Sequence, residues 1–411
     1  MSSLTAAVAG DRAHAGFELG LDSCAVLFLP ILVLASKGAA PLAVVAGICA
    51  FGLVAPRGWA AWRRVRGLAL IFIALVAWGV LSSLWAVEPQ RSLVVALQLA
   101  GMFAAGLALI AAASEIAAPE RLLLCFVTGL VIALVLTALQ FWTHGALTNP
   151  MSQRLFDDPA LNHAEDGFGF LLLPLCATLI LRRQRALAGI LAAVTVMVIA
   201  LLIGDAPRLA FIVGVAGAVL LYFWRAWLVR LAAVLSVVLI LSAPLVFPQL
   251  GEIDALRHRA EHFKLSAWHR LEIWSFVGAR IVERPLLGWG LGSSRAIPGG
   301  TALTPEGRPW LPLHPHNAPL QLWLELGVPG AALFALFAAR LWLALGAVAW
   351  PRLYAAAAGG SLVTALTVAL GSYGIWQEWL IASEFLTLFL ILVMARLAAQ
   401  PIPETRAGSI S

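Results

Sequence analysis

The chain has 411 residues, of which 62% are hydrophobic and only 12% are charged, and its mean hydropathy is +0.93. Soluble domains carry about 25% charged residues, so a soluble fold of this size is excluded. The formal net charge of +6 fits basic loops beside a membrane better than a basic face on a soluble domain, and no nucleic-acid partner is expected. The composition predicts an all-α polytopic membrane protein surrounded by membrane lipid.

Apolar stretches recur along nearly the whole chain. A helix that crosses the hydrocarbon core of a bilayer needs about 20 mostly apolar residues. The apolar windows and the breaks between them predict twelve transmembrane spans, at 24–36, 39–54, 68–86, 92–113, 122–142, 168–181, 187–203, 209–224, 231–247, 318–345, 353–370 and 380–396. An even number of spans places both chain ends on one side of the membrane, and the first 23 residues are expected to form a short cytoplasmic tail.

The positions of the Lys and Arg residues indicate which side that is. If both termini are cytoplasmic, the inside segments hold fifteen of them: Arg12, Arg57, Arg63, Arg64, Arg66, Arg121, Arg182, Arg183, Arg185, Arg225, Arg230, Arg340, Arg352, Arg396 and Arg406. The short outside loops then hold four: Lys37, Arg91, Arg154 and Arg208. Because short cytoplasmic loops carry the excess of basic residues, both termini are predicted to be cytoplasmic.

The predicted outer side carries a long loop at 248–317 and most of the histidines. Seven of the eight histidines lie on this side: His144, His163, His258, His262, His269, His314 and His316. A loop of this length is usually functional or structured, and the apolar residues at helical spacing in 266–283 predict an amphipathic helix. A second short helix is predicted at 253–264. The chain therefore divides into helices one to nine at 1–247, the loop, and helices ten to twelve with a tail at 318–411.

His316 and Asn317 stand at the outer mouth of the tenth predicted span. A neutral imidazole accepts a proton near pH 7, which makes histidine the commonest general base. The alternative is an interfacial histidine that is satisfied by water or lipid headgroups. His314 lies two residues earlier, across Pro315, and points elsewhere if the segment is extended, because side chains alternate along an extended chain. It is a second candidate for substrate binding, together with Asn317.

The tenth span also contains a breaker sequence and a buried charge. Glycine and proline at 327–330 predict a bend, which a membrane helix tolerates when neighbours satisfy the freed backbone groups. Glu325 lies just before the bend, and a carboxyl group at membrane depth indicates a partner or a function. Glu325 is therefore a candidate substrate-binding residue. The alternative is a charge near the interface that pairs with an arginine and fixes the packing.

Two arginines on the outer side are candidates for binding an anionic substrate. Arg208 lies in the break between the seventh and eighth spans, where a helix N-terminus is also available. Arg270 lies on the amphipathic loop helix, with Trp274 one turn later. Guanidinium groups form paired, charge-assisted hydrogen bonds with phosphate, so two arginines and a histidine around one cavity suit a lipid-linked diphosphate. The alternative is that these arginines reach out to lipid headgroups.

An acidic segment lies between the fifth and sixth spans. It contains Asp157, Asp158, Glu165 and Asp166, with Asn162 and His163 between them. Gathered carboxylates bind Ca²⁺, Mg²⁺ or Mn²⁺ when their spacing suits a coordination sphere. These acids show no clear ligand spacing, so a solvated loop is expected and no metal or other cofactor is predicted. Asn162 and His163 remain candidates for contact with a sugar.

The residues from His316 onward resemble a known family signature. His316 and Asn317, followed by Leu-Gln-Leu-Trp-Leu-Glu-Leu-Gly-Val-Pro-Gly, are similar to the His-Asn, Leu-Gln, Glu-Leu-Gly, Gly pattern of the O-antigen ligase and polymerase superfamily. Upstream, Arg270 and Trp274 resemble the Arg-x-x-x-Trp helix of that family. The segment beginning at Pro285 resembles its Pro-x-x-Gly-x-Gly turn.

The resemblance extends to the large outer loop and to Tyr-Gly-Ile-Trp-Gln-Glu-Trp-Leu near the C-terminus. Together these features cover the topology of the chain and roughly its last third in motif detail. One segment departs from the pattern. The family often has Ser-x-x-Arg or Ser-Arg before the corresponding span, whereas this chain reads Asp-Ala-Pro-Arg-Leu at 205–209.

The resemblance implies a glycosyltransferase of the GT-C type in the bacterial inner membrane, with its active site facing the periplasm and no metal or other cofactor. The ligases of the family move a preassembled glycan from undecaprenyl diphosphate to the lipid A-core oligosaccharide. By this resemblance His316 would be the base that activates the acceptor hydroxyl. Arg208 and Arg270 would hold the donor diphosphate as negative charge develops on it, and one displacement would invert the anomeric carbon.

Two further functions remain open. A polymerase that extends the glycan on the lipid carrier shares these motifs, although the single large loop and the Trp-Gln-Glu-Trp ending favour a ligase. A transporter of a polyprenyl-linked substrate would surround a midplane site with broken helices. The ionisable and imidazole side chains gather at the predicted outer face, with few at membrane depth, which favours an enzyme over a transporter.

Overall fold

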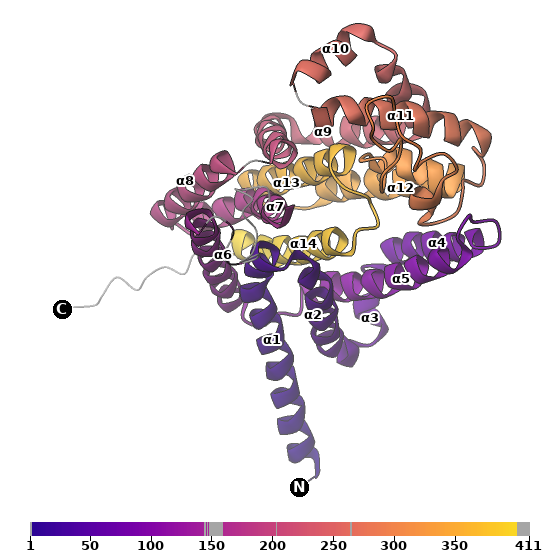
Figure 1. The fold of residues 1–411 in the computed structure, drawn as a ribbon. Helices are drawn as coiled ribbons and strands as arrows, with labels where there is room; N and C mark the ends of the chain where they lie inside the picture. The colour runs from indigo at the N-terminus through magenta and orange to yellow at the C-terminus, as the bar shows by residue number, and fades with distance from the viewer. Residues whose placement is uncertain are drawn as a thin grey trace.

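The computed structural model describes residues 2–143, 145, 147, 159–202, 204–263 and 265–400. The described residues are predominantly helical, and their β-structure is limited to an isolated bridge between Leu303 and Pro309 (Figure 1). This agrees with the all-α prediction.

The described residues form fourteen α-helices and three short 3-10 turns. They are α1 (Ser2–Leu34), α2 (Ala39–Val54), α3 (Trp59–Trp62), α4 (Arg66–Ser82), α5 (Pro89–Ala112), α6 (Pro119–Trp142), α7 (Pro159–Leu181), α8 (Arg185–Leu201), α9 (Asp205–Gly251), α10 (Asp254–Phe263), α11 (Leu265–Glu283), α12 (Ala318–Ala347), α13 (Arg352–Gly371) and α14 (Glu378–Ala399). The short 3-10 turns are η1 (Ser36–Gly38), η2 (Ala55–Arg57) and η3 (Ser293–Ala296).

Many of these helices have the length and composition of membrane spans. In the part of the chain that the structure describes, nine stretches qualify: Ala13–Leu34, Ser36–Arg57, Pro89–Ala112, Pro119–Trp142, Leu161–Leu181, Asp205–Gly251, Ala318–Ala347, Arg352–Gly371 and Glu378–Ala399. Two shorter apolar helices, α4 and α8, accompany them. The chain is therefore a polytopic helical membrane protein.

Small residues allow the helices to approach one another closely. A Cβ at Gly129 of α6 would collide with the Val26 carbonyl of α1, and one at Gly47 of α2 would lie 2.5 Å from the Ala105 Cβ of α5. Hydrophobic side chains are not driven together by lipid, so membrane helices associate through this kind of close packing. These contacts tie the N-terminal helices to each other beneath the C-terminal ones.

The long helix α9 consists of two halves that run in opposite directions. Its backbone leaves helical geometry at Trp224. The first half packs antiparallel to α13, since Gly214 lies against Thr364 whereas Leu221 lies against Gly359. The second half packs antiparallel to α12, as the Trp323 indole donates to the Ile240 carbonyl at 2.8 Å and Gly346 faces Val229 nearer the reversal. Because α12 and α13 are themselves antiparallel, α9 turns back at Trp224.

Arginines hold the chain together at the end of the bundle where α9 reverses. The list of these contacts is short: Arg352 donates to the Tyr222 carbonyl, Arg225 to Val348, Arg396 to Ala113 and Ile116, and Arg121 to Glu18 and Asp22. All four arginines belong to the set that the sequence assigns to the cytoplasmic side. The opposite end of the bundle carries α10, α11 and the turn-rich return to α12 (Figure 1).

The first span begins earlier than the sequence suggested. The stretch from Ala13 qualifies as part of a span, so the expectation that residues up to 23 form a tail is wrong. Glu18 and Asp22 are buried on α1, and both accept hydrogen bonds from Arg121 of α6, at 2.9 and 2.5 Å. Acids that are paired in this way can lie inside a helix. From the sequence alone, the span was expected to begin only after the last charge. The loop helices, by contrast, are confirmed: α10 and α11 match the predicted ranges to within a residue or two.

Candidate active site at the outer mouth of α12

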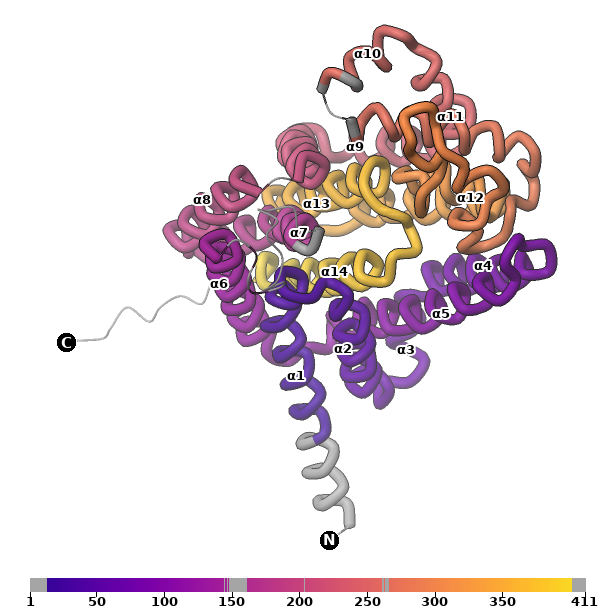
Figure 2. The backbone as a smooth tube through the Cα atoms, viewed as in Figure 1, coloured from indigo at the N-terminus to yellow at the C-terminus, as the bar shows by residue number. Residues whose placement is uncertain are grey.

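His316 precedes α12 and is held by the link between α13 and α14. Its Nδ1 lies 2.5 Å from the Ser372 carbonyl oxygen. A carbonyl only accepts, so Nδ1 carries the hydrogen and the lone pair of the neutral ring is on Nε2. Figure 2 shows the chain turning from α13 into α14 beside this part of α12. The contact therefore selects Nε2 as the atom that can accept a proton.

The backbone at His316 is strained. Its φ of 53° lies in the left-handed region, which is uncommon for a residue with a Cβ and costs about 1–2 kcal/mol. The strain is held by neighbours, because the His316 N–H donates to His314 Nδ1 at 3.2 Å and the Trp274 indole donates to the Pro315 carbonyl at 3.0 Å. A strained residue that the surroundings fix in this way is typical of functional sites.

Asn317 is the N-cap of α12. Its side-chain oxygen accepts from the Leu320 N–H at 3.0 Å, and its amide nitrogen donates to the Leu370 carbonyl at 3.3 Å. The side chain is fully buried. Asparagine is among the best N-caps, so the structure gives Asn317 the task of fixing the start of the helix beside His316. Trp274 likewise supports the segment through Pro315.

His314 is occupied on both ring nitrogens. Besides the His316 N–H at Nδ1, the Gln377 amide nitrogen lies 3.2 Å from Nε2. Burial, followed by the positive charges of neighbouring groups, lowers the pKa of His314 to about 3. Because Nδ1 accepts the His316 N–H, the hydrogen of the neutral ring is on Nε2. His314 therefore has no free lone pair to act as a base near pH 7, which separates it from His316.

The pKa of His316 is also lowered. Burial is the main cause, with further contributions from Arg270 and His269, and the Ser372 hydrogen bond opposes them. A pKa below the ordinary 6.5 keeps the ring neutral at pH 7. The structure thus presents an unprotonated Nε2 beside a cation.

Arg270 lies on α11 next to the two histidines. It interacts electrostatically with His314, His316 and Tyr373. Burial lowers the pKa of its guanidinium group, and the described residues supply no carboxylate to pair with it. A half-buried cation without an ion-pair partner favours an anionic ligand, because pairing offsets the cost of taking the charge out of water.

Arg208 lies in the first turn of α9, at the positive end of that helix. Its guanidinium donates to the Leu202 carbonyl, its backbone N–H donates to Gly204 at 3.1 Å, and Nε is buried with no hydrogen bond inside the described ranges. Glu165 of α7 interacts electrostatically with Arg208 and packs against Gly204. The helix N-terminus and the guanidinium together form a cationic corner.

The prediction that Glu165 and Asp166 lie in a solvated loop is wrong. α7 begins at Pro159, so both acids are helical, and their side chains are only 1% and 2% exposed. The hydroxyl of Tyr373, from the link before α14, interacts with Asp166. Arg208 interacts electrostatically with Glu165, and the four carboxylate oxygens of the two acids form no hydrogen bond that meets the distance and angle criteria among the described residues. Asp157 and Asp158 lie outside the described residues.

Tyr373 connects the two arginine regions. It interacts electrostatically with Arg270 on one side and with Glu165 and Asp166 on the other, and Glu165 in turn faces Arg208. Burial, reinforced by Asp166, raises the pKa of Tyr373 well above its usual value, so the phenol keeps its proton. His316, Arg270 and Arg208 therefore belong to one group of polar side chains that interact electrostatically through Tyr373 and Glu165.

Asn162 and His163 occupy the first turns of α7, at the edge of this group. His163 Nδ1 lies 2.8 Å from the Ser36 hydroxyl, and its ring lies 3.8 Å from that of Trp379. The Asn162 side-chain oxygen packs against Gly204, just before α9. Both residues are held against neighbouring helices, and their predicted contact with a sugar remains a prediction.

The predicted bend in α12 is confirmed at Gly327, where φ is 61° and the backbone leaves helical geometry. The carbonyls that the bend releases find donors elsewhere. The N–H groups of Trp289 and Gly290 donate to the carbonyls of residues 324 and 325 at 2.9 and 2.8 Å, and the Trp78 indole donates to that of residue 326 at 2.9 Å. Gly288 lies against the same backbone, where a Cβ would come within 2.5 Å of it. The turn after α11 is thereby fastened to α12.

Glu325 is completely buried beneath this turn. Its partners are the Gly292 N–H at 2.5 Å, the Ser294 N–H at 3.4 Å and hydroxyl, the Gln321 amide at 3.0 Å and the Trp376 indole at 2.6 Å. These donors are uncharged, so the expectation that Glu325 pairs with an arginine is not met among the described residues. The sequence could not show this, because the main partners lie 33 and 51 residues away.

Glu325 also aligns the link that holds His316. Gln321, which donates to Glu325, accepts from the Ile375 N–H at 3.0 Å, and Trp376 donates to Glu325 directly. Residues 375 and 376 follow Ser372, the acceptor of the His316 ring. Glu325 therefore joins the turn after α11 to the link before α14.

Substituting glutamine for Glu325 is expected to lower the free energy of unfolding by about 2 kcal/mol, because its NH2 group would face donors and leave a buried group unsatisfied. Thermal unfolding of the detergent-solubilised protein measures this. Glu283→Gln, a change at the partly exposed end of α11, is the matched control. An unchanged midpoint for Glu325→Gln would contradict the role given to this carboxylate.

Several site residues were not singled out from the sequence. Ser372, Tyr373 and Gln377 lie in or beside the segment that resembled the family near the C-terminus, so the resemblance was the available signal. Gln321 belongs to the Leu-Gln motif, but the sequence assigned it no role. Their contacts with 314–325 join residues more than 50 positions apart, and no local pattern predicts such pairs.

A family model described as "O-Antigen ligase" matches residues 170–335. This part of the chain is therefore similar to the O-antigen ligase family. The match contains Arg208, Arg270, Trp274, His316 and Glu325 and ends before the link at 372–377. The resemblance stated from the sequence motifs is thus confirmed.

Curated proteins from Rickettsia are similar to most of the chain. A Rickettsia conorii protein named "Putative polysaccharide ligase" is 28% identical over 343 residues, which is 81% of this chain and 80% of the relative. A Rickettsia typhi protein of the same name is 26% identical over 344 residues, or 80% of each chain. A third, from Rickettsia bellii, is 35% identical over 135 residues, or 32% of this chain and 33% of the relative.

Proposed function

We propose that the protein is an O-antigen ligase that transfers a preassembled glycan from undecaprenyl diphosphate to the lipid A-core oligosaccharide. The observation that carries the proposal is the orientation of His316, whose Nδ1 faces Ser372 and whose Nε2 is left to accept a proton beside Arg270. The family match and the names of the Rickettsia relatives support transfer of a glycan.

The proposed reaction is a single displacement. His316 Nε2 takes the proton of the acceptor hydroxyl as its oxygen attacks the anomeric carbon. The bond from that carbon to the diphosphate breaks, its electron pair stays on the diphosphate oxygen, and the anomeric configuration inverts. Arg270 and Arg208 would face the negative charge that develops on the leaving group, where fixed cations lower the barrier most. The proposal needs no metal, because guanidinium groups bind the diphosphate.

The membrane arrangement that accompanies this proposal has twelve crossings. It counts the two shorter apolar helices, α4 and α8, and treats α9 as two passes around Trp224. The arginines at the reversal end of the bundle support cytoplasmic termini, and the opposite end would then place His316 at the periplasmic face of the inner membrane. This is the layout of a GT-C glycosyltransferase.

Two alternatives remain as candidate functions. A polymerase would use the same base and the same cations, with a second carrier-linked glycan as its acceptor. A transporter would need a substrate site at the membrane midplane. The polar group described above lies at one end of the bundle, which supports an enzyme.

The deciding experiment is transfer by the purified protein, with an undecaprenyl-diphosphate glycan as donor and lipid A-core as acceptor, with and without EDTA. We expect lipid A-core to be modified equally in both conditions. Longer glycan on the carrier, with unmodified lipid A-core, would instead identify a polymerase. Absence of both products would reject the enzyme proposal, and loss of transfer with EDTA would reject its metal independence.

A further inference from the structure

A cavity runs through the membrane part of the protein, along α14. It has a volume of about 310 Å³ and lies between α4, α5, α7, α12, α13 and α14. One end is bordered by Tyr373 and Trp376, close to the link that holds His316, and the other by Leu345 and Trp350. Its walls are formed almost entirely by Phe, Leu, Ile and Ala side chains. A space of this shape and composition is suited to a hydrocarbon chain.

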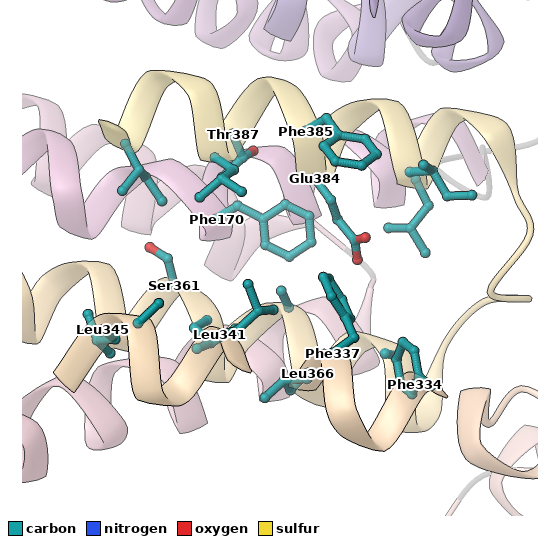
Figure 3. A pocket seen from close by; sticks show the side chains of 18 of the residues that line it. Phe170, Phe334, Phe337, Leu341, Leu345, Ser361, Leu366, Glu384, Phe385 and Thr387 are labelled. Carbon is teal, nitrogen blue, oxygen red and sulfur yellow. The ribbon is translucent and has the colours of Figure 1, made fainter. Parts of the chain in front are cut away.

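Two polar side chains of α14 interrupt the apolar wall. Figure 3 shows the carboxyl group of Glu384 pointing from α14 toward the helix that carries Phe337, with Thr387 one turn further along. Glu384 forms no hydrogen bond or ion pair with the residues that the structure describes, and its surface is open to the cavity. The Thr387 hydroxyl is buried and likewise lacks a hydrogen-bond partner there.

Glu384 favours a ligand with an oxygen acceptor. The Thr387 hydroxyl oxygen has almost no surface open to the cavity, so Glu384 is the group that a ligand can reach. An ionised carboxylate facing apolar walls without a cation is strongly disfavoured, so the uncharged acid is the stable form in such a place. The uncharged acid has one O–H donor. A chain made only of carbon and hydrogen would cover this donor without satisfying it, and a buried unsatisfied donor weakens binding.

The depth of Glu384 narrows the choice of ligand. It lies six residues after Glu378, the first residue of α14, or about 9 Å along the helix axis at 1.5 Å per residue. Charged lipid headgroups lie outside the hydrocarbon core, whereas the ester oxygens of acyl lipids lie at the junction between headgroup and chains. A polyprenyl chain has no oxygen below its phosphate.

We propose that this cavity binds an acyl chain of an ester-linked membrane lipid, whose ester oxygen accepts a hydrogen bond from Glu384. The remainder of the chain fills the space lined by Phe337, Leu341 and Leu345. This lipid is distinct from the polyprenyl donor of the transfer reaction, and its binding does not depend on that reaction. The occupied cavity would pack α14 against α12 and α13 beneath the site.

Photo-crosslinking of the full-length protein in nanodiscs tests the proposal. Three probes are compared: phosphatidylethanolamine with a diazirine on an ester-linked acyl chain, its ether-linked analogue, and a diazirine-labelled polyprenyl phosphate. Mass spectrometry then locates the modified residues. We expect the ester probe to label cavity residues such as Phe337, and the ether probe to label them about five-fold less, the factor expected for one lost hydrogen bond.

Matched variants identify the donor. Glu384→Leu removes it and is expected to lower labelling by the ester probe about five-fold. Glu384→Gln keeps a donor and is expected to retain labelling, and Glu378→Gln, at the start of the same helix, is the control. The melting temperature of each variant shows separately that it is folded, whether or not the protein transfers glycan.

Three results would overturn the proposal. Labelling of the cavity by the polyprenyl probe, undiminished by Glu384→Leu, would assign the space to the hydrocarbon tail of the donor. Equal labelling by the ester and ether probes would exclude a hydrogen bond from Glu384 to the ester oxygen. Absence of cavity labelling by every probe would show that no lipid chain enters. Each can occur whether or not the protein is a ligase, so this test and the transfer assay fail independently.

Discussion

Replacing His316 by asparagine is expected to lower the rate of glycan transfer at least about 100-fold, the lower range of what a general base contributes. Asparagine tolerates a positive φ, so it fits the strained backbone at this position. Its amide can also donate to the Ser372 carbonyl. The substitution therefore removes the proton acceptor at Nε2 while it keeps the local geometry, and the loss can be assigned to chemistry.

The measurement is the initial rate of lipid A-core modification at saturating donor, together with the melting temperature of each variant. His262→Asn, on the exposed face of α10, is the matched control and should transfer at the native rate. His316→Gly also suits the positive φ, and added imidazole should restore part of its activity. Transfer by His316→Asn within a few-fold of native would exclude His316 as the base.

Replacing Arg270 by glutamine is expected to have two effects. Transfer should fall by about 10²–10³, the effect of removing one group that stabilises developing charge. The acid limb of the pH profile of kcat/KM should also move to higher pH. Protonated His316 cannot accept a proton, so activity falls as the pH drops through its pKa. Arg270 helps to hold that pKa below the ordinary 6.5, and its removal raises it.

The shift of the acid limb distinguishes Arg270 from a residue that only supports the fold. A general loss of structure would lower the profile at every pH without moving its limb. Arg280→Gln is the control. Arg280 lies ten residues after Arg270 on α11 and pairs with Glu283 at 2.7 Å, so its substitution should leave the acid limb in place. A limb that does not move in Arg270→Gln would contradict the electrostatic coupling to His316.

The parts of the fold that could be predicted are those that depend on local sequence. Apolar runs gave the positions of the membrane helices, and helical spacing gave α10 and α11. The bend in α12 followed from glycine and proline at 327–330. These features depend on composition and on neighbours within a few residues, so a single sequence contains them.

The parts that could not be predicted depend on contacts between distant segments. Charges made the predicted first span begin too late and placed Glu165 and Asp166 in a loop, because sequence does not show the arginines and tyrosine that accompany buried acids. His316 was identifiable as a candidate, but the choice of Nε2 required Ser372, 56 residues away. Glu384 is an acid inside an apolar run. The sequence does not show that it lines a cavity, because six helices form that cavity.

The link before α14 also determines the order in which the site is assembled. Synthesis proceeds from the N-terminus, and early segments fold while later ones are still absent. Ser372 and Gln377, which hold the rings of His316 and His314, enter with the last hairpin of the chain. The imidazole therefore reaches its working tautomer and position only when that hairpin is in place, so a nascent or truncated chain carries every earlier site residue and still lacks an aligned base.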